Sequence, residues 1–148
     1  MKDVFEHIIG QEKVKRKLNF FLKSYSKTGV SPHILLVAPK GTGKTMVAKA
    51  YAKGLIPRGR DKYKKGILIN CSILKNIRDF MDKYAETLDQ EEATFIFDES
   101  SEIPHDISMA LLTILNPNTK KRNKFTYNEI EYNVDFRRIT FIFATTEP

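Results

Sequence analysis

Residues 35–55, LLVAPKGTGKTMVAKAYAKGL, constrain the fold more than any other stretch of this chain. A short apolar run at residues 34–37 leads into a glycine-rich loop, and a helical pattern follows over residues 44–55. The first N–H groups of a helix lack partners, and the helix dipole adds partial positive charge there. A glycine loop that leads into such a helix lets the backbone surround an anion. The stretch therefore predicts a phosphate-binding loop between a buried strand and a helix.

The side chains of this loop predict which phosphate compound it binds. Lys44 would place a full charge against the terminal phosphates, and the Thr45 hydroxyl would take a place on Mg²⁺. The expected cofactors are therefore ATP and Mg²⁺. The residues expected to bind them from this segment are Pro39, Lys40, Gly41, Thr42, Gly43, Lys44, Thr45 and Met46. The alternative is a glycine turn without a ligand, which the coincidence of strand, loop, Lys-Thr pair and helix disfavours.

Ala38 departs from the G-x-x-x-x-G-K-[ST] pattern, which has its first glycine at this position. The position accepts little bulk, and alanine is the smallest replacement for glycine. We expect alanine to be tolerated there unless the backbone needs a positive φ angle.

Length and composition indicate one cytoplasmic domain. The chain has 148 residues, of which 41% are hydrophobic, enough for a single core. No apolar run is long enough to span a membrane, and no secretory signal opens the chain, so no membrane partner is expected. The single cysteine, Cys71, is expected to be a small buried thiol. The net charge of +7 favours anionic partners without identifying one.

The order of apolar patterns predicts an α/β doubly wound domain. Short apolar runs at residues 34–37, 67–69, 95–97 and 141–144 are typical of parallel strands covered on both faces. Helical patterns lie between or before them, at residues 11–27, 44–55, 76–88 and 104–115. Pro104 suits the first turn of the last helix. The resulting order is a helix followed by βαβαβ.

The third run, TFIFDES, ends in two carboxylates that could complete the site. Ligands of parallel α/β sheets gather at the carboxyl ends of the strands. Asp98 is placed to hold the Mg²⁺ that Thr45 shares, and Glu99 would polarise the water that attacks the γ-phosphate. The alternative is an acidic cap on the next helix.

The fourth run ends FATTEP and adds a candidate for holding the attacking water. Thr146 is the first choice and Thr145 the second. The alternative, a threonine that satisfies loop backbone, is nearly as well supported for each of them.

Four segments together carry a resemblance to a known family: IIGQEKVKRKL, HILLVAPKGTGKT, FIFDES and ITFIFATTEP. They resemble the AAA+ ATPases, and within them the RuvB family of Holliday-junction branch-migration motors. The resemblance covers nearly the whole chain. It implies a P-loop NTPase (AAA+) domain with a parallel sheet flanked by helices.

The resemblance also implies further site residues. Ile8, Ile9 and Gly10 would line the adenine pocket, although they could equally form a turn before the first helix. The segment INCSIL is similar to bacterial enhancer-binding activators, in which the matching residue, here Asn70, holds the catalytic glutamate. The alternative for Asn70 is a local turn former.

Comparison with the family predicts that residues 1–148 are part of the large ATPase subdomain, truncated after the fourth core strand. The fifth strand, the arginine finger, the helical lid and any C-terminal DNA-binding domain are expected beyond it. Residues 34–37 would then lie at an open sheet edge, which invites self-association, and turnover by this chain alone would be weak.

Two basic stretches bear on the partner. They are KGLIPRGRDKYKK at residues 53–65 and NTKKRNK at residues 118–124, and a hairpin pattern, FTYNEIEYNV, follows the second. Such stretches suit DNA but are more often solvated surface. In RuvB-like motors the hairpin insertion contacts the partner protein RuvA.

Three functions remain open from the sequence. The first is an ATP-driven motor on branched or duplex DNA, acting in recombination and repair as a homo-oligomeric ring with a RuvA-like partner. The second is a clamp-loader-like ATPase that places another protein on DNA. The third is a protein-remodelling or transcription-activating module.

Overall fold

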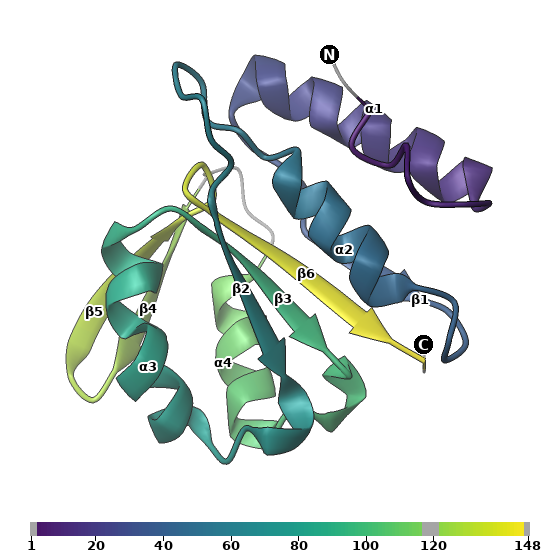
Figure 1. The fold of residues 1–148 in the computed structure, drawn as a ribbon. Coiled ribbons are helices and arrows are strands. Elements are labelled where there is room, and N and C mark those ends of the chain that lie inside the picture. Colours follow the sequence, from purple (N-terminus) through teal and green to yellow (C-terminus); the bar gives the residue numbers. More distant parts are fainter. Residues whose placement is uncertain (1–2, 117–121, 147–148) are drawn as a thin grey trace.

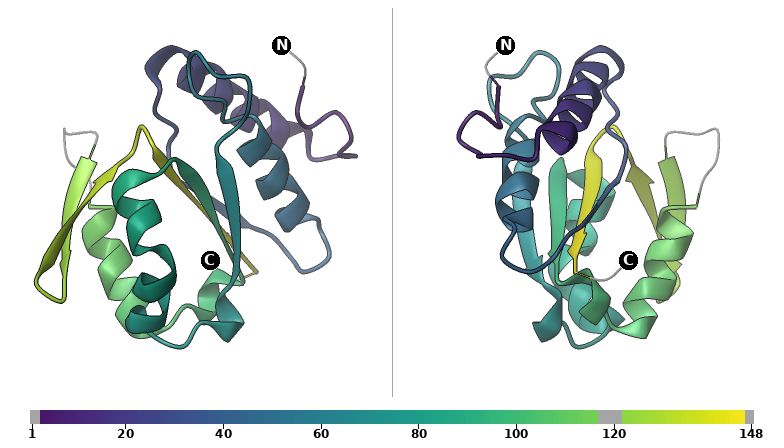
Figure 2. Two further views of the ribbon diagram at one scale, coloured as in Figure 1. Left: turned by 60° about the vertical axis from the view of Figure 1, so that its left-hand side comes forward. Right: turned by 90° about the vertical axis from the view of Figure 1, so that its right-hand side faces the viewer.

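The computed structural model describes residues 3–116 and 122–146. A parallel sheet lies between two layers, with α1 and α2 on one face and α3, α4 and a β-hairpin on the other (Figures 1 and 2). In chain order the helices and strands are α1 (Glu12–Thr28), β1 (Ile34–Val37), α2 (Lys44–Lys53), β2 (Lys65–Asn70), α3 (Ile77–Gln90), β3 (Ala93–Asp98), α4 (His105–Ile114), β4 (Arg122–Tyr127), β5 (Ile130–Asp135) and β6 (Ile139–Thr145). Short 3₁₀ turns follow β2 at Cys71–Ile73 and β3 at Ser100–Glu102.

The four strands of the main sheet are parallel and follow the order β1-β6-β3-β2. This arrangement confirms the α/β prediction. Each expected strand and helix forms, and no end differs from its expected position by more than two residues. Pro104 precedes α4 as its N-cap residue rather than starting the helix.

Alternating side chains of the central strands supply both cores. Phe95, Phe97 and Phe141 face α3 and α4, whereas Ile96 and Ile142 face α1 and α2. Neighbouring rings stack across β3 and β6, with 5.6 Å between the Phe95 and Phe141 centroids. Because one strand buries both of its faces, its sequence is apolar without alternation.

The expectation that every strand is covered on both faces is wrong for both edge strands, β1 and β2, and Leu68 of β2 is 47% exposed. Ile34 packs under α1 and α2, but the side chains of Leu35 and Val37 are 59% and 45% exposed. Strand β1 lies at the edge of the sheet. Among the described helices, α3 and α4 lie on the face to which Leu35 and Val37 point, but they pack on the other strands and do not cover β1. Edge position is a property of strand order, so the apolar run alone could not reveal it; the edge position expected from the family resemblance agrees with the observed order.

The hairpin of β4 and β5 forms as expected, although it packs against the domain and does not project as an arm. Phe125 and Val134 are buried in the core shared with α3 and α4. The Asn133 N–H donates to Asp89 of α3 at 2.9 Å, and the Asn123 amide donates to the Ile114 carbonyl of α4 at 2.6 Å. These contacts fix the hairpin on both helices.

His33, just before β1, uses its side chain as a hydrogen-bond acceptor for the backbone of β6. Its Nδ1 accepts the Phe141 N–H at 3.2 Å, and its ring packs on Phe136 with 4.8 Å between centroids. Burial, with a smaller contribution from the Lys64 charge, lowers the pKa of His33 to about 4. The ring is therefore neutral at pH 7, as an acceptor at Nδ1 requires.

This pKa predicts that stability falls as the pH decreases from 6.5 towards 4. In that range the unfolded chain binds a proton at His33 and the folded chain does not, so the stability present at neutral pH is lost. At pH 5 the loss from this group is about 2 kcal/mol relative to pH 7. Urea unfolding at both pH values should show this difference in the wild type and a smaller one in His33→Gln. An equal difference in both proteins would contradict the assignment.

Candidate functional site

The loop between β1 and α2 has the conformation that phosphate binding needs. Gly41 and Gly43 have φ angles of 85° and 82°, which only glycine adopts without cost, and Gly43 is the N-cap residue of α2. Ala38 has no positive φ angle, since the described non-glycine residues with one are Gln11, Glu99, Asn128 and Glu129. The replacement of the first glycine by Ala38 therefore leaves the loop backbone unstrained at that position.

A pocket of about 510 Å³ opens at the carboxyl ends of β3 and β6, next to this loop. Its lining comprises Lys40, Gly41, Gly43, Lys44, Thr45, Asp98, Glu99, Ser101, Glu102, Ala144, Thr145 and Thr146. The loop, the end of β3 and the end of β6 thus meet in one cavity. Pro39, Thr42 and Met46 do not line it.

The pair Thr45 and Asp98 lies at the centre of this pocket. The Thr45 hydroxyl donates to Asp98 Oδ2 at 3.3 Å, although the two residues are 53 positions apart in the chain. A hydroxyl and a carboxylate side by side are oxygen ligands of the kind that Mg²⁺ takes together with phosphate oxygens. The residues present therefore fit a magnesium–nucleotide complex.

Lys44 is held at the rim of the same pocket by the loop itself. Its ammonium group donates to the Ala38 carbonyl at 2.7 Å and to the Pro39 carbonyl at 3.2 Å. Neither acceptor is a carboxylate, so the positive charge is not neutralised by these contacts. A phosphate group in the pocket would offer Lys44 a charged acceptor, and hydrogen bonds between charged partners are about twice as strong as neutral ones.

Glu99 lines the pocket from the turn after β3. Its backbone is left-handed, with φ 56°, and its side chain makes no cap bond to the 3₁₀ turn that follows. The Glu99 N–H donates to Asp98 Oδ1 at 3.1 Å. The alternative expectation, an acidic cap, is therefore not what this side chain does here.

The two threonines at the end of β6 differ in exposure. Thr145 is buried and Thr146 is exposed, and both line the pocket. Thr145 is also the register partner of Val37 in β1. The geometry thus brings both candidates to the site.

Asn70 is not held against Glu99. Its side-chain oxygen accepts from the Ser72 N–H at 3.1 Å and from the Ser72 hydroxyl at 2.8 Å, so it caps the 3₁₀ turn after β2. Local turn formation explains this residue. Beside it, burial raises the pKa of the Cys71 thiol to about 12, and the carboxylates of Asp98 and Glu99 add to the effect. As expected, Cys71 is buried.

The residues at positions 8–10, which precede the N-cap residue of α1, do not line the phosphate pocket. Ile8 is buried under α1, Ile9 is 96% exposed, and Gly10 has a φ angle of 77°. Their place in an adenine pocket stays a prediction, because the phosphate pocket does not include the adenine position. Sequence reasoning missed the next residue, Gln11, whose amide donates to the Thr42 carbonyl of the loop at 2.8 Å.

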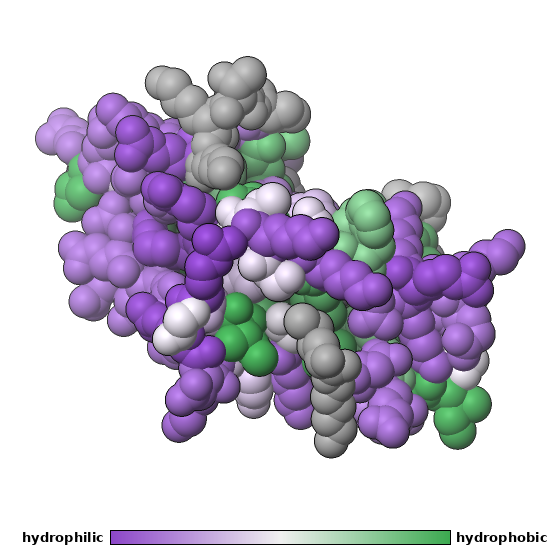
Figure 3. Space-filling model, turned by 90° about the horizontal axis from the view of Figure 1, so that it is seen from above, coloured by the Kyte–Doolittle hydropathy of each residue, from purple (hydrophilic) through white to green (hydrophobic). Residues whose placement is uncertain are grey.

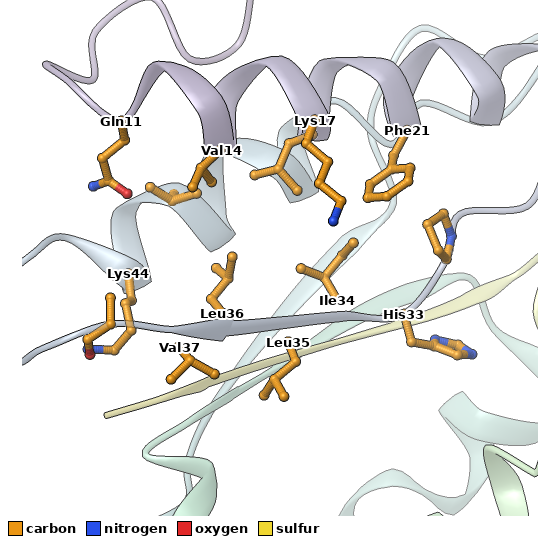
Figure 4. Close-up of a pocket in the computed structure, with 14 residues that line it drawn as sticks. Gln11, Val14, Lys17, Phe21, His33, Ile34, Leu35, Leu36, Val37 and Lys44 are labelled. Atoms are coloured by element: carbon orange, nitrogen blue, oxygen red, sulfur yellow. The ribbon is translucent and has the colours of Figure 1, made fainter. Parts of the chain in front are cut away.

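A second cavity, of about 420 Å³, lies between α1 and β1 (Figure 4). Val14 and Phe21 of α1 point towards Ile34 and Leu36 of β1, and Lys44 lies at one end. Lys44 lines both cavities, so this apolar space adjoins the phosphate pocket.

The basic stretch at residues 53–65 is partly used inside the domain. Arg58 donates to the Lys27 carbonyl at the end of α1 at 2.6 Å, and Arg60 pairs with Glu92. Lys64 is only 3% exposed and donates to the Thr140 hydroxyl at 2.8 Å. Three positive charges of this stretch thus have internal partners, although the face seen in Figure 3, which includes α1, is mostly hydrophilic.

The second basic stretch is described only in part. Lys120 and Lys121 lie outside the described residues, whereas Arg122 and Lys124 are exposed on β4. Lys124 pairs with Glu131 across the hairpin at 3.6 Å.

In the described part of the chain, no helix is both long and apolar enough to cross a membrane.

Comparison with known proteins gives relatives with longer chains. Replication factor C small subunit 2 of Pyrobaculum islandicum is 32% identical over 117 residues, which are 75% of this chain and 35% of that protein. The small subunit from Methanocella arvoryzae is 33% identical over 112 residues, 72% of this chain and 33% of its own. Lon protease of Clostridioides difficile is 28% identical, covering 95% of this chain and 19% of the protease. The chain thus spans about a third of the length of the replication factor subunits.

Solved structures with the same fold include RuvB of Thermotoga maritima, a Holliday junction branch migration motor. It superposes with a TM-score of 0.68 at 23% identity and covers 98% of this chain and 41% of its own. A mutant of that protein gives a TM-score of 0.69 and covers 99% and 42%. Residues 34–148 match the AAA family, the ATPase family associated with various cellular activities. That match includes the loop, Asp98, Glu99 and both threonines, and the chain therefore belongs to the AAA family of ATPases.

Proposed function

We propose that this chain is the ATP-hydrolysing module of a DNA motor of the RuvB kind, which works as a homo-oligomeric ring. One observation carries the enzymatic part: Lys44, the Thr45–Asp98 pair and Glu99 meet in one pocket at the end of a parallel sheet. Phosphoryl transfer needs positioning and charge stabilisation more than covalent help, and these groups supply both.

Each residue of the pocket has a distinct task in this proposal. The loop amides and Lys44 bind the phosphates, while Thr45 and Asp98 hold Mg²⁺. When bound, that ion neutralises charge on the phosphate oxygens. Glu99 accepts a proton from the attacking water, and Thr146, with Thr145 as the alternative, orients that water.

Two features support the DNA motor. The fold agrees with RuvB over nearly the whole chain, including a hairpin between α4 and β6. The net charge of +7 also favours a polyanionic partner. A RuvA-like protein bound to DNA is then the expected partner of the hairpin.

A clamp-loader-like ATPase is the second candidate. It is favoured by the 32% identity to a subunit of a replication factor, which exceeds the 23% identity to RuvB. ATPase assays on the full chain separate the candidates. Stimulation by a four-way DNA junction supports the motor, and stimulation by a sliding clamp on primed DNA supports the second. Stimulation by polypeptide without DNA would contradict both.

Removing the charge of Lys44 should weaken nucleotide binding. We expect Lys44→Ala to raise the dissociation constant of Mg-ATP about 10- to 100-fold, because a charge-assisted hydrogen bond to phosphate is lost. Calorimetry on Lys49→Ala, an exposed lysine of the same helix, provides the matched control. Equal affinities in Lys44→Ala and the wild type would exclude a phosphate site here.

The two carboxylates should separate binding from chemistry. We expect Glu99→Gln to retain ATP but to lose about 100-fold or more in turnover, since an amide cannot accept the proton of water. Asp98→Asn should instead raise the Mg²⁺ concentration that half-saturates binding. Single-turnover hydrolysis by the complete protein measures the first effect, because turnover by residues 1–148 alone is expected to be weak. The exposed Glu86→Gln is the control. Wild-type turnover in Glu99→Gln would place the base elsewhere.

If the second basic stretch contacts DNA, neutralising it should flatten the salt dependence of binding. Replacing Lys120, Lys121, Arg122 and Lys124 by serine should lower the slope of log affinity against log salt by about 0.9 for each side chain that contacts phosphate.

The matched control replaces four exposed basic residues of α1, Lys13, Arg16, Lys23 and Lys27, and so changes the net charge equally. Fluorescence anisotropy with a four-way junction measures both slopes. If the two variants lose the same slope, the second basic stretch is ordinary charged surface.

A further inference from the structure

The hydrogen bond between Gln11 and the phosphate-binding loop joins two segments far apart in the sequence. The Gln11 amide donates to the Thr42 carbonyl at 2.8 Å across 31 positions of the chain. Figure 4 shows Gln11 at the start of α1, at the same end of the cavity as Lys44. Among the described residues, no other hydrogen bond joins the segment before α1 to the loop.

The backbone around Gln11 is bent in an unusual way to make this contact. Gly10 and Gln11 both have positive φ angles, 77° and 57°, and for Gln11 this left-handed conformation costs free energy. Gln11 is also the N-cap residue of α1 but makes no side-chain cap bond to that helix. Because the Gln11 side chain does not cap α1, its amide is available to bond the loop.

The Thr42–Gly43 peptide has few other restraints on its orientation. Glycines stand on both sides of Thr42, and their backbones rotate more freely than those of other residues. The Thr42 hydroxyl donates to the Pro39 carbonyl at 2.7 Å, which fixes the side chain and not the plane of the following peptide. The Gln11 amide is bonded to the carbonyl of that peptide itself.

The planarity of the peptide links this carbonyl to the nucleotide pocket. In a trans peptide the C=O of Thr42 and the N–H of Gly43 point in opposite directions. Gly41 and Gly43 line the phosphate pocket, whereas Thr42 does not. A donor that keeps the Thr42 carbonyl outside the pocket therefore aims the Gly43 N–H towards it.

We propose that Gln11 is a positioning residue for nucleotide binding, which holds the Thr42–Gly43 peptide so that the Gly43 N–H faces the phosphate. The proposal rests on the ATP-binding function proposed above. Gln11 acts through the backbone of the loop and does not itself contact the nucleotide. Without this bond the Thr42–Gly43 peptide can rotate. The Gly43 N–H then has to be turned back towards the phosphate when nucleotide binds, which weakens binding.

Two substitutions separate positioning from a structural role. Gln11→Met keeps the length of the side chain and removes the donor, and it should raise the dissociation constants of Mg-ATP and Mg-ADP about three- to tenfold. Gln11→Gly also removes the donor but relieves the left-handed backbone. It should weaken binding similarly while the melting temperature without nucleotide stays equal or rises. Gln90→Met, at an exposed position of α3, is the control.

Calorimetry and thermal unfolding of the full chain decide between the outcomes. Weaker binding together with unchanged or higher stability supports the proposal, because a purely structural residue would lower both. Unchanged affinity in both Gln11 variants overturns it, provided that the wild type binds Mg-ATP and Lys44→Ala binds it more weakly. If the wild type itself fails to bind, the proposed function fails instead.

Discussion

The position of β6 between β1 and β3 is the constraint on which the rest of the structure depends. Its register sets Thr145 beside Val37 and Ala144 beside Asp98, so three strands end together. Stacked phenylalanines across β3 and β6 hold this register, with 5.1 Å between the Phe97 and Phe143 centroids. A slip of one residue would turn these rings to the opposite face. Because α2 begins directly after the β1 loop, the same register brings Thr45 to Asp98.

Positive φ angles of non-glycine residues occur at two places in the described chain, the hairpin turn and the surroundings of the pocket. Two of its four non-glycine residues with positive φ angles, Asn128 and Glu129, form the hairpin turn, where such angles are expected. The others, Gln11 and Glu99, each contact or line the nucleotide site. Such conformations cost about 1–3 kcal/mol each and persist only where the surrounding structure compensates. Glu99 directly follows β3, and Gln11 is held by its hydrogen bond to the loop.

Local patterns in the sequence predicted the helices, the strands and the loop. Which strand lies at an edge, and which distant residues contact each other, depends on longer-range geometry. The four strands and the phosphate-binding loop were predictable because apolar runs and glycines act over a few residues. The exposure of Leu35 follows from strand order, which no short window contains. Asn70 was ambiguous because an asparagine at a strand end suits both a local cap and a distant partner. The Gln11 contact spans 31 positions and carries no local signal.

Positive charge in this chain is less available than its composition suggests. The net charge is +7, yet the described structure pairs Arg60 with Glu92, places Arg58 on carbonyls of α1 and buries Lys64. Burial lowers the pKa of Lys64 to about 8, so the group is still mostly protonated at pH 7. Its charge then lies inside the domain, because the side chain is buried. Other basic side chains of the same stretch, Lys53, Lys62 and Lys65, stay exposed, so a polyanion would meet these rather than the buried Lys64.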